Sequence, residues 1–129
     1  LISYNLTPIT YKLKNMEAIA KSTGIKISTR KVRIVADAVR DMSVQQALSK
    51  LSLIEKRGAY PLTKAIKSAV ANAVNNNKMK AANLIIAKLE VNEGPFLKRF
   101  RPSTRGRVHP YKKRSSHITV ILREGGTAS

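Results

Sequence analysis

The sequence contains no cysteine, which excludes a disulfide framework and any metal site built on thiolates. It has no apolar run long enough to cross a bilayer, so a membrane-spanning helix is not expected. Acidic residues are scarce: 7 Asp and Glu stand against 25 Lys and Arg, and the net charge is +18. This imbalance predicts a polyanionic partner, above all a nucleic acid. The alternative interpretation is a soluble protein with a solvated basic face.

Aromatic residues and catalytic groups are also sparse. Proteins that read single strands stack bases on aromatic platforms, but here Phe96, Phe100 and Tyr111 lie among basic residues. Packing at the base of a ribbon and stacking on RNA both stay open for the two phenylalanines. The histidines, His109 and His117, have no carboxylate cluster near them, so no metal site or cofactor is expected. We interpret His117 as a hydrogen-bonding strand residue and expect no enzymatic activity.

Two strand-like runs flank the most basic part of the chain. Residues 84–91 form the first run and residues 117–122 the second, which is short and β-branched. In the first run one parity is apolar throughout, which is the period of a half-buried strand. The residues predicted on that buried face are Ile85, Ala87, Leu89 and Val91.

The connection between these runs is far longer than the two residues that a tight hairpin needs. No acidic residue occurs from Gly94 to Arg123, so the cations of this segment have no partners within it. If it continues the strands as a paired ribbon, each arm extends roughly 30–45 Å. An isolated two-stranded ribbon is marginal in water, so we expect it to be ordered only when embedded in a partner.

Three amphipathic helices are predicted in the first half of the chain. Ser28 or Thr29 is the expected N-cap of the first, and Ser43 opens the second with a capping box. The third carries Pro61 in its first turn and ends at residues 75–77, because asparagine tolerates left-handed backbone. The apolar stripes are Val32, Val35, Ala36 and Val39, then Val44, Ala47, Leu48 and Leu51, then Leu62, Ala65, Ile66, Ala69, Val70, Ala73 and Val74.

These elements predict an α+β fold. A short edge strand at residues 18–22, broken by Gly24, precedes the three helices and the two later strands. The helices can lie on one face of a small antiparallel sheet, which leaves the basic excursion to project outward. The expected architecture is therefore three helices packed on a small antiparallel sheet, with a long extended β-hairpin projecting from it.

The domain organisation is expected to be simple, because 129 residues suffice for one domain with a modest core. Residues 1–15 are interpreted as an N-terminal extension, with Met16 as a possible original start. Residues 16–123 form the predicted single globular domain, with the hairpin at about 91–114. Residues 124–129 are the predicted C-terminal tail.

Several motifs, in the same order along the chain, are similar to those of one known family. They are Arg30–Asp37, Ala71–Ala73, Val91–Pro95, Leu97–Arg99, Pro102–Arg107 and Lys113–Val120. On these motifs residues 16–123 resemble the bacterial-type large-subunit ribosomal protein twenty-two family, a universal family with a long exit-tunnel hairpin. Ser103 and Thr104 depart from the usual Arg and Ala, so one charge at the hairpin tip is missing.

The resemblance implies a structural constituent of the large ribosomal subunit that binds large-subunit ribosomal RNA. It further implies that the hairpin tip helps line the peptide exit tunnel, in a region associated with macrolide sensitivity. The implied partners are this RNA, neighbouring large-subunit proteins and the nascent peptide, with no membrane and no cofactor. The implied location is cytoplasmic, in the large subunit, and an organellar ribosome is left open.

The predicted site residues are cations that would neutralise and clamp RNA segments. The predicted RNA contacts are Arg30, Lys31, Arg33, Arg40, Lys98, Arg99, Arg101, Arg105, Arg107, Lys112, Lys113 and Arg114. The tunnel-lining residues implied by the resemblance are Leu97, Lys98, Arg99, Ser103, Thr104, Arg105, Gly106 and Arg107. Gly106 is expected at a turn that needs a positive φ or a close approach of RNA.

Two other function classes stay open. A free-standing regulator of RNA or DNA would have an ordered ribbon and base-specific contacts, and a helix-turn-helix formed by the first two helices would leave the most basic segment unexplained. A hydrolase with an unusual site would show a concave pocket with perturbed titratable groups.

Overall fold

The structure is a computed structural model that describes residues 17–125. The predicted extension, Met16 and most of the predicted tail lie outside this range. In chain order the elements are β1 (Glu17–Ile25), α2 (Thr29–Val39), α3 (Val44–Leu53), α4 (Ala59–Asn75), η1 (Ala81–Asn83), β2 (Leu84–Glu93), β3 (Leu97–Pro102), η2 (Thr104–Gly106), β4 (Val108–Lys113) and β5 (Ser116–Glu124).

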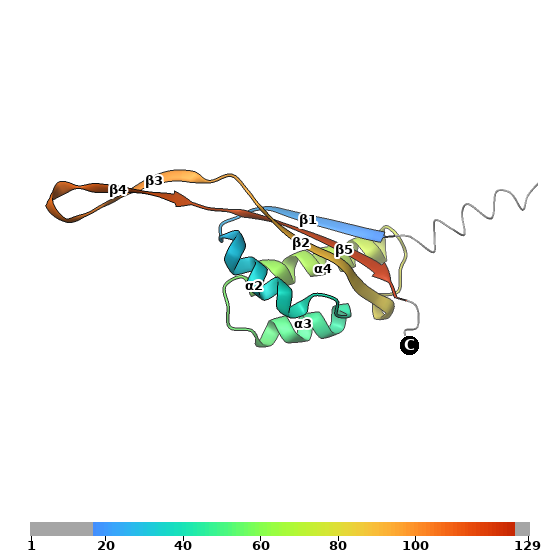
Figure 1. The fold of residues 1–129 in the computed structure, drawn as a ribbon. Coiled ribbons are helices and arrows are strands. Elements are labelled where there is room, and N and C mark those ends of the chain that lie inside the picture. Colours follow the sequence, from blue (N-terminus) through green and yellow to red (C-terminus); the bar gives the residue numbers. More distant parts are fainter. Residues whose placement is uncertain (1–16, 126–129) are drawn as a thin grey trace, which may run out of the picture.

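The strands form two antiparallel sheets, one with the order β1-β5-β2 and one that pairs β3 with β4. All three helices lie on the same face of the three-stranded sheet, and the β3–β4 pair projects away from them (Figure 1). We call residues 17–93 and 116–125 the body, residues 97–113 the hairpin, and residues 94–96 with 114–115 the neck. The predicted α+β fold class is confirmed.

The core lies between the sheet and the helices. It is filled by the predicted helical stripes, whose regular spacing turns one face of each helix towards the sheet. Leu62 and Ile66 of α4 are fully buried, and so are Ile118 and Leu122 of the central strand β5. Val74 is predicted in the α4 stripe, but it is 40% exposed because it lies at the edge of that stripe, whereas Ala73 in the same turn is fully buried.

Strand β2 buries a different face from the one predicted for its first half. Leu84 and Ile86 are buried there instead of Ile85 and Ala87. The register with β5 shifts between Ile86 and Lys88, so a β-bulge inserts one extra residue at this point. Because side chains alternate with a period of two, the insertion exchanges the two faces, and the parity that was apolar throughout does not share one side.

The helix ends follow the predicted positions, with two differences in chemistry. Ser43 caps α3, and its Oγ accepts a hydrogen bond from the Gln46 amide at 3.4 Å, as expected for the capping box. Ser28 occupies the N-cap position of α2, but its side chain makes no capping hydrogen bond. Helix α4 ends at the predicted asparagines, yet the left-handed residue that follows is Lys78, with φ 52°.

The predicted edge strand is β1, which among residues 17–125 pairs with β5 alone. Two asparagine amides near the C-terminal end of α4 hold it from the helix side. Asn72 donates to the Ile19 carbonyl at 3.1 Å, and Asn77 donates to the Glu17 carbonyl at 3.2 Å. Strand β1 is therefore attached along both its sheet partner and the helix beneath it.

Candidate nucleic-acid interface

The hairpin has no core of its own. Its ladder pairs Leu97 with Lys113 at the neck end and Pro102 with Val108 at the tip end. Every residue of β3 and β4 is exposed. The ladder hydrogen bonds hold the two strands together, while the side chains on both faces remain available to a partner.

Strand alternation divides the hairpin side chains between two faces. One face is cationic and polar, and the cross-strand register places on it Leu97, Arg99, Arg101, His109, Tyr111 and Lys113. The other face is apolar towards the tip and carries two lysines near the neck: Lys98, Phe100, Pro102, Val108, Pro110 and Lys112.

The positive charges of the hairpin are not balanced within it. Lys98 lies directly opposite Lys112, and like charges in that position destabilise a strand pair. Aromatic rings provide the partners that carboxylates do not: the Arg101 guanidinium lies 5.2 Å from the centre of the Tyr111 ring, and the Lys112 ammonium lies 4.6 Å from that of Phe96. A polyanion would relieve the remaining repulsion.

The tip turns through two left-handed residues, Arg105 with φ 60° and Gly106 with φ 71°. The Ser103 amide donates to the Arg107 carbonyl at 2.6 Å and closes the loop. The predicted need for positive φ at Gly106 is confirmed. Among residues 17–125, no heavy atom would lie within 4 Å of a Cβ at this position, so the backbone conformation accounts for this glycine better than crowding does.

The neck joins the hairpin to the body through close backbone contacts. The Gly94 amide donates to the Ser115 carbonyl at 3.0 Å, and the Ser115 hydroxyl donates to the Pro95 carbonyl. The imidazole of His117 accepts a hydrogen bond at Nδ1 from the Gly24 amide at 3.1 Å, which confirms its role as a hydrogen-bonding strand residue. This bond spans the point where the β1–β5 register shifts.

The predicted RNA contacts on α2 divide into two groups. Arg30 and Lys31 are exposed at the start of the helix, next to the neck. Arg33 donates from Nε and Nη2 to the Val91 carbonyl, at 3.1 and 2.9 Å, and Arg40 forms an ion pair of 3.2 Å with Asp37. The structure therefore gives Arg33 and Arg40 intramolecular partners, which the sequence did not indicate.

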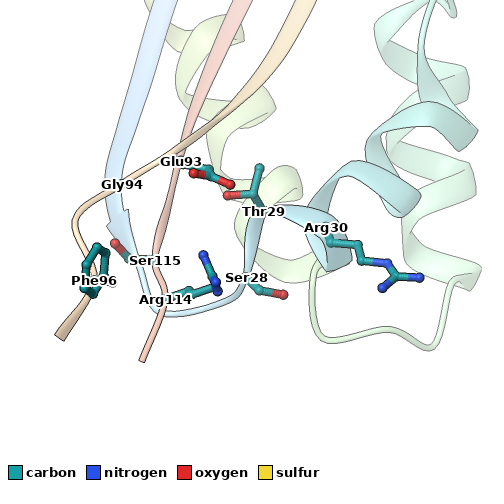
Figure 2. A pocket seen from close by; sticks show the side chains of 8 residues that line it. All are labelled: Ser28, Thr29, Arg30, Glu93, Gly94, Phe96, Arg114 and Ser115. Atoms are coloured by element: carbon teal, nitrogen blue, oxygen red, sulfur yellow. The ribbon is translucent and has the colours of Figure 1, made fainter. Parts of the chain in front are cut away.

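A cavity of about 310 Å³ lies where the start of α2 meets the neck. We call it the neck cup, and Figure 2 shows its lining side chains. It is lined by Ser28, Thr29, Arg30, Glu93, Gly94, Phe96, Arg114 and Ser115. It brings two of the predicted RNA contacts, Arg30 and Arg114, to the same site from distant parts of the chain. Sequence reasoning missed it because its three segments have no common motif.

Within residues 17–125, no group of three or more His, Asp or Glu side chains is arranged to hold a metal ion. Over the same residues, none of the helices has both the length and the apolar character needed to span a membrane.

Comparison with known proteins gives consistent matches. Residues 20–123 match the family described as ribosomal protein L22p/L17e. "Large ribosomal subunit protein uL22" of Mesoplasma florum is 50% identical over 107 residues, which cover 83% of this chain and 96% of the relative. The protein of the same name from Thermus thermophilus is 50% identical over 109 residues, covering 84% and 96%. That of Caldicellulosiruptor saccharolyticus is 53% identical over 98 residues, covering 76% and 80%.

These relatives are bacterial, which agrees with the prediction of a bacterial-type member in the large subunit of a cytoplasmic ribosome. The match extends over the body and the whole hairpin, so it covers the fold and the candidate interface alike. The chain belongs to the L22p/L17e family of ribosomal proteins, which are structural components of the large ribosomal subunit and not enzymes.

Proposed function

We propose that this chain binds large-subunit ribosomal RNA through its hairpin and the adjacent start of α2, and that the hairpin tip lines the peptide exit tunnel. The observation that supports it most directly is a projecting β-ladder whose side chains are all exposed and whose cations take part in neither of the two ion pairs found among residues 17–125. A folded RNA supplies what this element lacks, because phosphates neutralise its charge and surrounding helices order it.

The two faces of the hairpin suggest how it would lie in RNA. The face that carries Arg99 and Arg101 offers guanidinium groups, which bind phosphate through two parallel hydrogen bonds. The face that carries Phe100 and Val108 is suited to ribose and unstacked bases. From Gly94 to Ser103 an extended chain reaches about 30 Å, which is enough to pass between several RNA helices.

The tip residues, Ser103 to Arg107, are the part of the chain farthest from the body along the hairpin (Figure 1). We place the tunnel surface there, with the nascent peptide as its transient partner. The exposed helical side of the body is then the surface for neighbouring large-subunit proteins.

Salt dependence tests RNA binding. We expect the affinity of the full chain for purified large-subunit ribosomal RNA to fall linearly on a log–log plot against salt concentration, because each neutralised phosphate releases counterions. Replacing Lys98, Arg99 and Arg101 together by glutamine should reduce the slope by about 2–3, since each contact contributes roughly 0.7–0.9.

The matched control replaces three exposed lysines of the helices, Lys50, Lys64 and Lys67, by glutamine. Both variants lose three charges, so an equal loss of slope would show that only net charge matters and would contradict a hairpin-centred interface. Filter binding from 50 to 200 mM salt provides the measurement.

The absence of cysteine makes the tunnel proposal directly testable. A Thr104→Cys variant carries a single thiol at the tip, and incorporated into translating ribosomes it should form cross-links to the nascent chain. A Lys67→Cys variant on α4 should form none. Cross-linking at Lys67 but not at Thr104 would refute the placement of the tip.

A further inference from the structure

The neck cup contains opposite charges that do not pair with each other. Arg114 and Glu93 both line it, yet the two ion pairs formed among residues 17–125 are Asp37–Arg40 and Lys88–Glu90. Figure 2 shows the Arg114 side chain directed into the cup, whereas Arg30 points away from its centre. A cation and an anion that border one cavity without a bond leave donor and acceptor groups free for a ligand.

Thr29 provides a second polar group at the same place. Its residue is only 5% exposed and it lines the cup, where solvent can still reach its hydroxyl. The hydroxyl points to the side of the cup where Glu93 lies (Figure 2). A hydroxyl that lines the cup can donate or accept a hydrogen bond, so it offers a ligand one more polar contact.

The aromatic wall of the cup is Phe96, which is 43% exposed. Lys112 lies over its ring at 4.6 Å, and the remaining exposed area is available to a second planar or apolar group. Aromatic side chains beside basic residues are the usual platform for a splayed-out base. An inorganic anion would have no use for an aromatic wall, whereas a base could stack on it.

The size of the cup also points to a ligand larger than an ion. Its volume of about 310 Å³ equals the liquid volume of about ten water molecules, which is the scale of one nucleotide. The carboxylate of Glu93 would repel a bare phosphate, but it can accept a hydrogen bond from a ribose hydroxyl or a base amino group.

We propose that the neck cup receives one unstacked nucleotide of the RNA that the hairpin binds. Phe96 stacks on the base, Arg114 and the first amides of α2 bind a phosphate, and Glu93 accepts a hydrogen bond from the 2′-hydroxyl or a base amino group. The nucleotide would be gripped where the hairpin leaves the body. This inference rests on the proposed RNA-binding function and adds a defined subsite to it.

The test uses the ¹⁵N-labelled full chain and four probes: adenosine 5′-monophosphate, cytidine 5′-monophosphate, 2′-deoxyadenosine 5′-monophosphate and inorganic phosphate. We expect the amide signals of Gly94 and Ser115 to shift saturably with a nucleotide and more weakly with phosphate. Phe96→Leu should weaken nucleotide binding about fivefold or more, because base–aromatic stacking contributes that much.

Glu93→Gln is the more specific test, because it should change nucleotide binding and phosphate binding in opposite directions. It should weaken nucleotide binding about 3–10-fold through the lost charge-assisted hydrogen bond, and it should strengthen the binding of phosphate because a repulsive charge is gone. The matched controls lie outside the cup: Glu90→Gln removes another β2 carboxylate, and Tyr60→Leu removes an exposed ring that likewise has a lysine over it. Neither control should change the affinity for any probe.

Three results would overturn the subsite: no saturable nucleotide binding, phosphate binding as tight as that of the nucleotides, or unchanged affinity in both cup variants. The salt-dependence experiment separates this failure from failure of the proposed function. If the wild-type chain binds large-subunit RNA while the cup variants behave like the controls, the subsite alone is wrong. If the wild-type chain does not bind that RNA, the proposed function is wrong.

Discussion

The body and the hairpin are built on opposite principles. Within residues 17–125, all of the buried hydrophobic side chains belong to the body, and every residue of β3 and β4 is exposed. The body is stabilised by removing apolar surface from water, whereas the hairpin has only its ladder and a few cation–aromatic contacts. The difference shows that burial of apolar surface stabilises the body but contributes nothing to β3 and β4.

Charge follows the same division. All seven acidic residues of the chain lie outside the segment from Gly94 to Ser115, so intramolecular ion pairs can form in the body but not in the hairpin. The hairpin therefore keeps its cations available, at a cost in its own stability when no polyanion is present.

Large-to-small substitutions should give the largest contrast between the two regions. Leu62→Ala removes a fully buried side chain of α4 and should lower the free energy of unfolding by about 2–5 kcal/mol. Phe100→Ala removes a larger side chain from the hairpin, but because it is 67% exposed the change should stay within about 0.5 kcal/mol. Urea unfolding measures both, and similar losses would mean that the hairpin contributes to the core.

The next largest contrast is expected between Gly94 in the neck and Gly106 at the hairpin tip. A Cβ at Gly94 would lie 2.6 Å from Ser115 Oγ and 3.0 Å from His117 Cε1, so Gly94→Ala should disturb the neck and cost about 1–3 kcal/mol. Gly106→Ala meets no neighbour but must adopt φ 71°, which strains only the tip. Its effect should appear as faster hydrogen exchange at the tip with unchanged global stability. Equal global losses would contradict this separation.

Two arginines of α2 should have different roles: Arg33 should contribute to stability and Arg30 to RNA binding. Arg33→Met removes both hydrogen bonds to the Val91 carbonyl and should cost about 1 kcal/mol, reduced by its partial exposure. Arg30→Met breaks no intramolecular hydrogen bond seen among the described residues, so it should leave the melting temperature unchanged and weaken RNA binding. Thermal melts measure the effect on stability and filter binding measures the effect on RNA affinity. Loss of stability in Arg30→Met together with loss of RNA binding alone in Arg33→Met would contradict these roles.

The smallest effect is expected at an exposed pair on β2. A hydrogen bond with Glu90, and then its charge, raise the pKa of Lys88 above the ordinary lysine value. Such a pair stabilises the fold below the unfolded lysine pKa and loses that contribution as pH rises through the folded one. Because the pair is exposed, Glu90→Gln should not change the neutral-pH melting temperature measurably. An alkaline NMR titration should show the Lys88 pKa returning towards its ordinary value.

Periodic patterns in the sequence predicted most of the body, because burial of one face leaves a direct trace in residue order. The helical stripes apart from Val74, the exposed basic excursion and the presence of the edge strand were correctly predicted, although that strand continues through Gly24 to Ile25. The predictions that were wrong concern single positions. The bulge at Ala87 exchanges the faces of β2, and no composition signal marks an inserted residue. Lys78, rather than an asparagine, adopts the left-handed conformation after α4.

The candidate site was predicted only in part, because charge does not reveal partners within the fold. Arg33 and Arg40 look like the other cations of α2 in sequence, yet they bind the Val91 carbonyl and Asp37. The neck cup was not predicted, since it depends on the sheet placing Arg114 beside the start of a helix more than eighty residues earlier. Pairing of β1 with β5, which sets Ile25 opposite Ser116, creates that proximity, and no single stretch encodes it.

The central position of β5, between β1 and β2, has a mechanical consequence. The two arms of the hairpin continue through the neck into β2 and β5, and β5 is held by hydrogen-bonded neighbours on both sides. Tension applied at the tip therefore runs along the strands, while the ladder bonds lie across them. Such a load is shared by many bonds in shear instead of opening them one after another, because the hairpin is anchored through the central strand of the sheet.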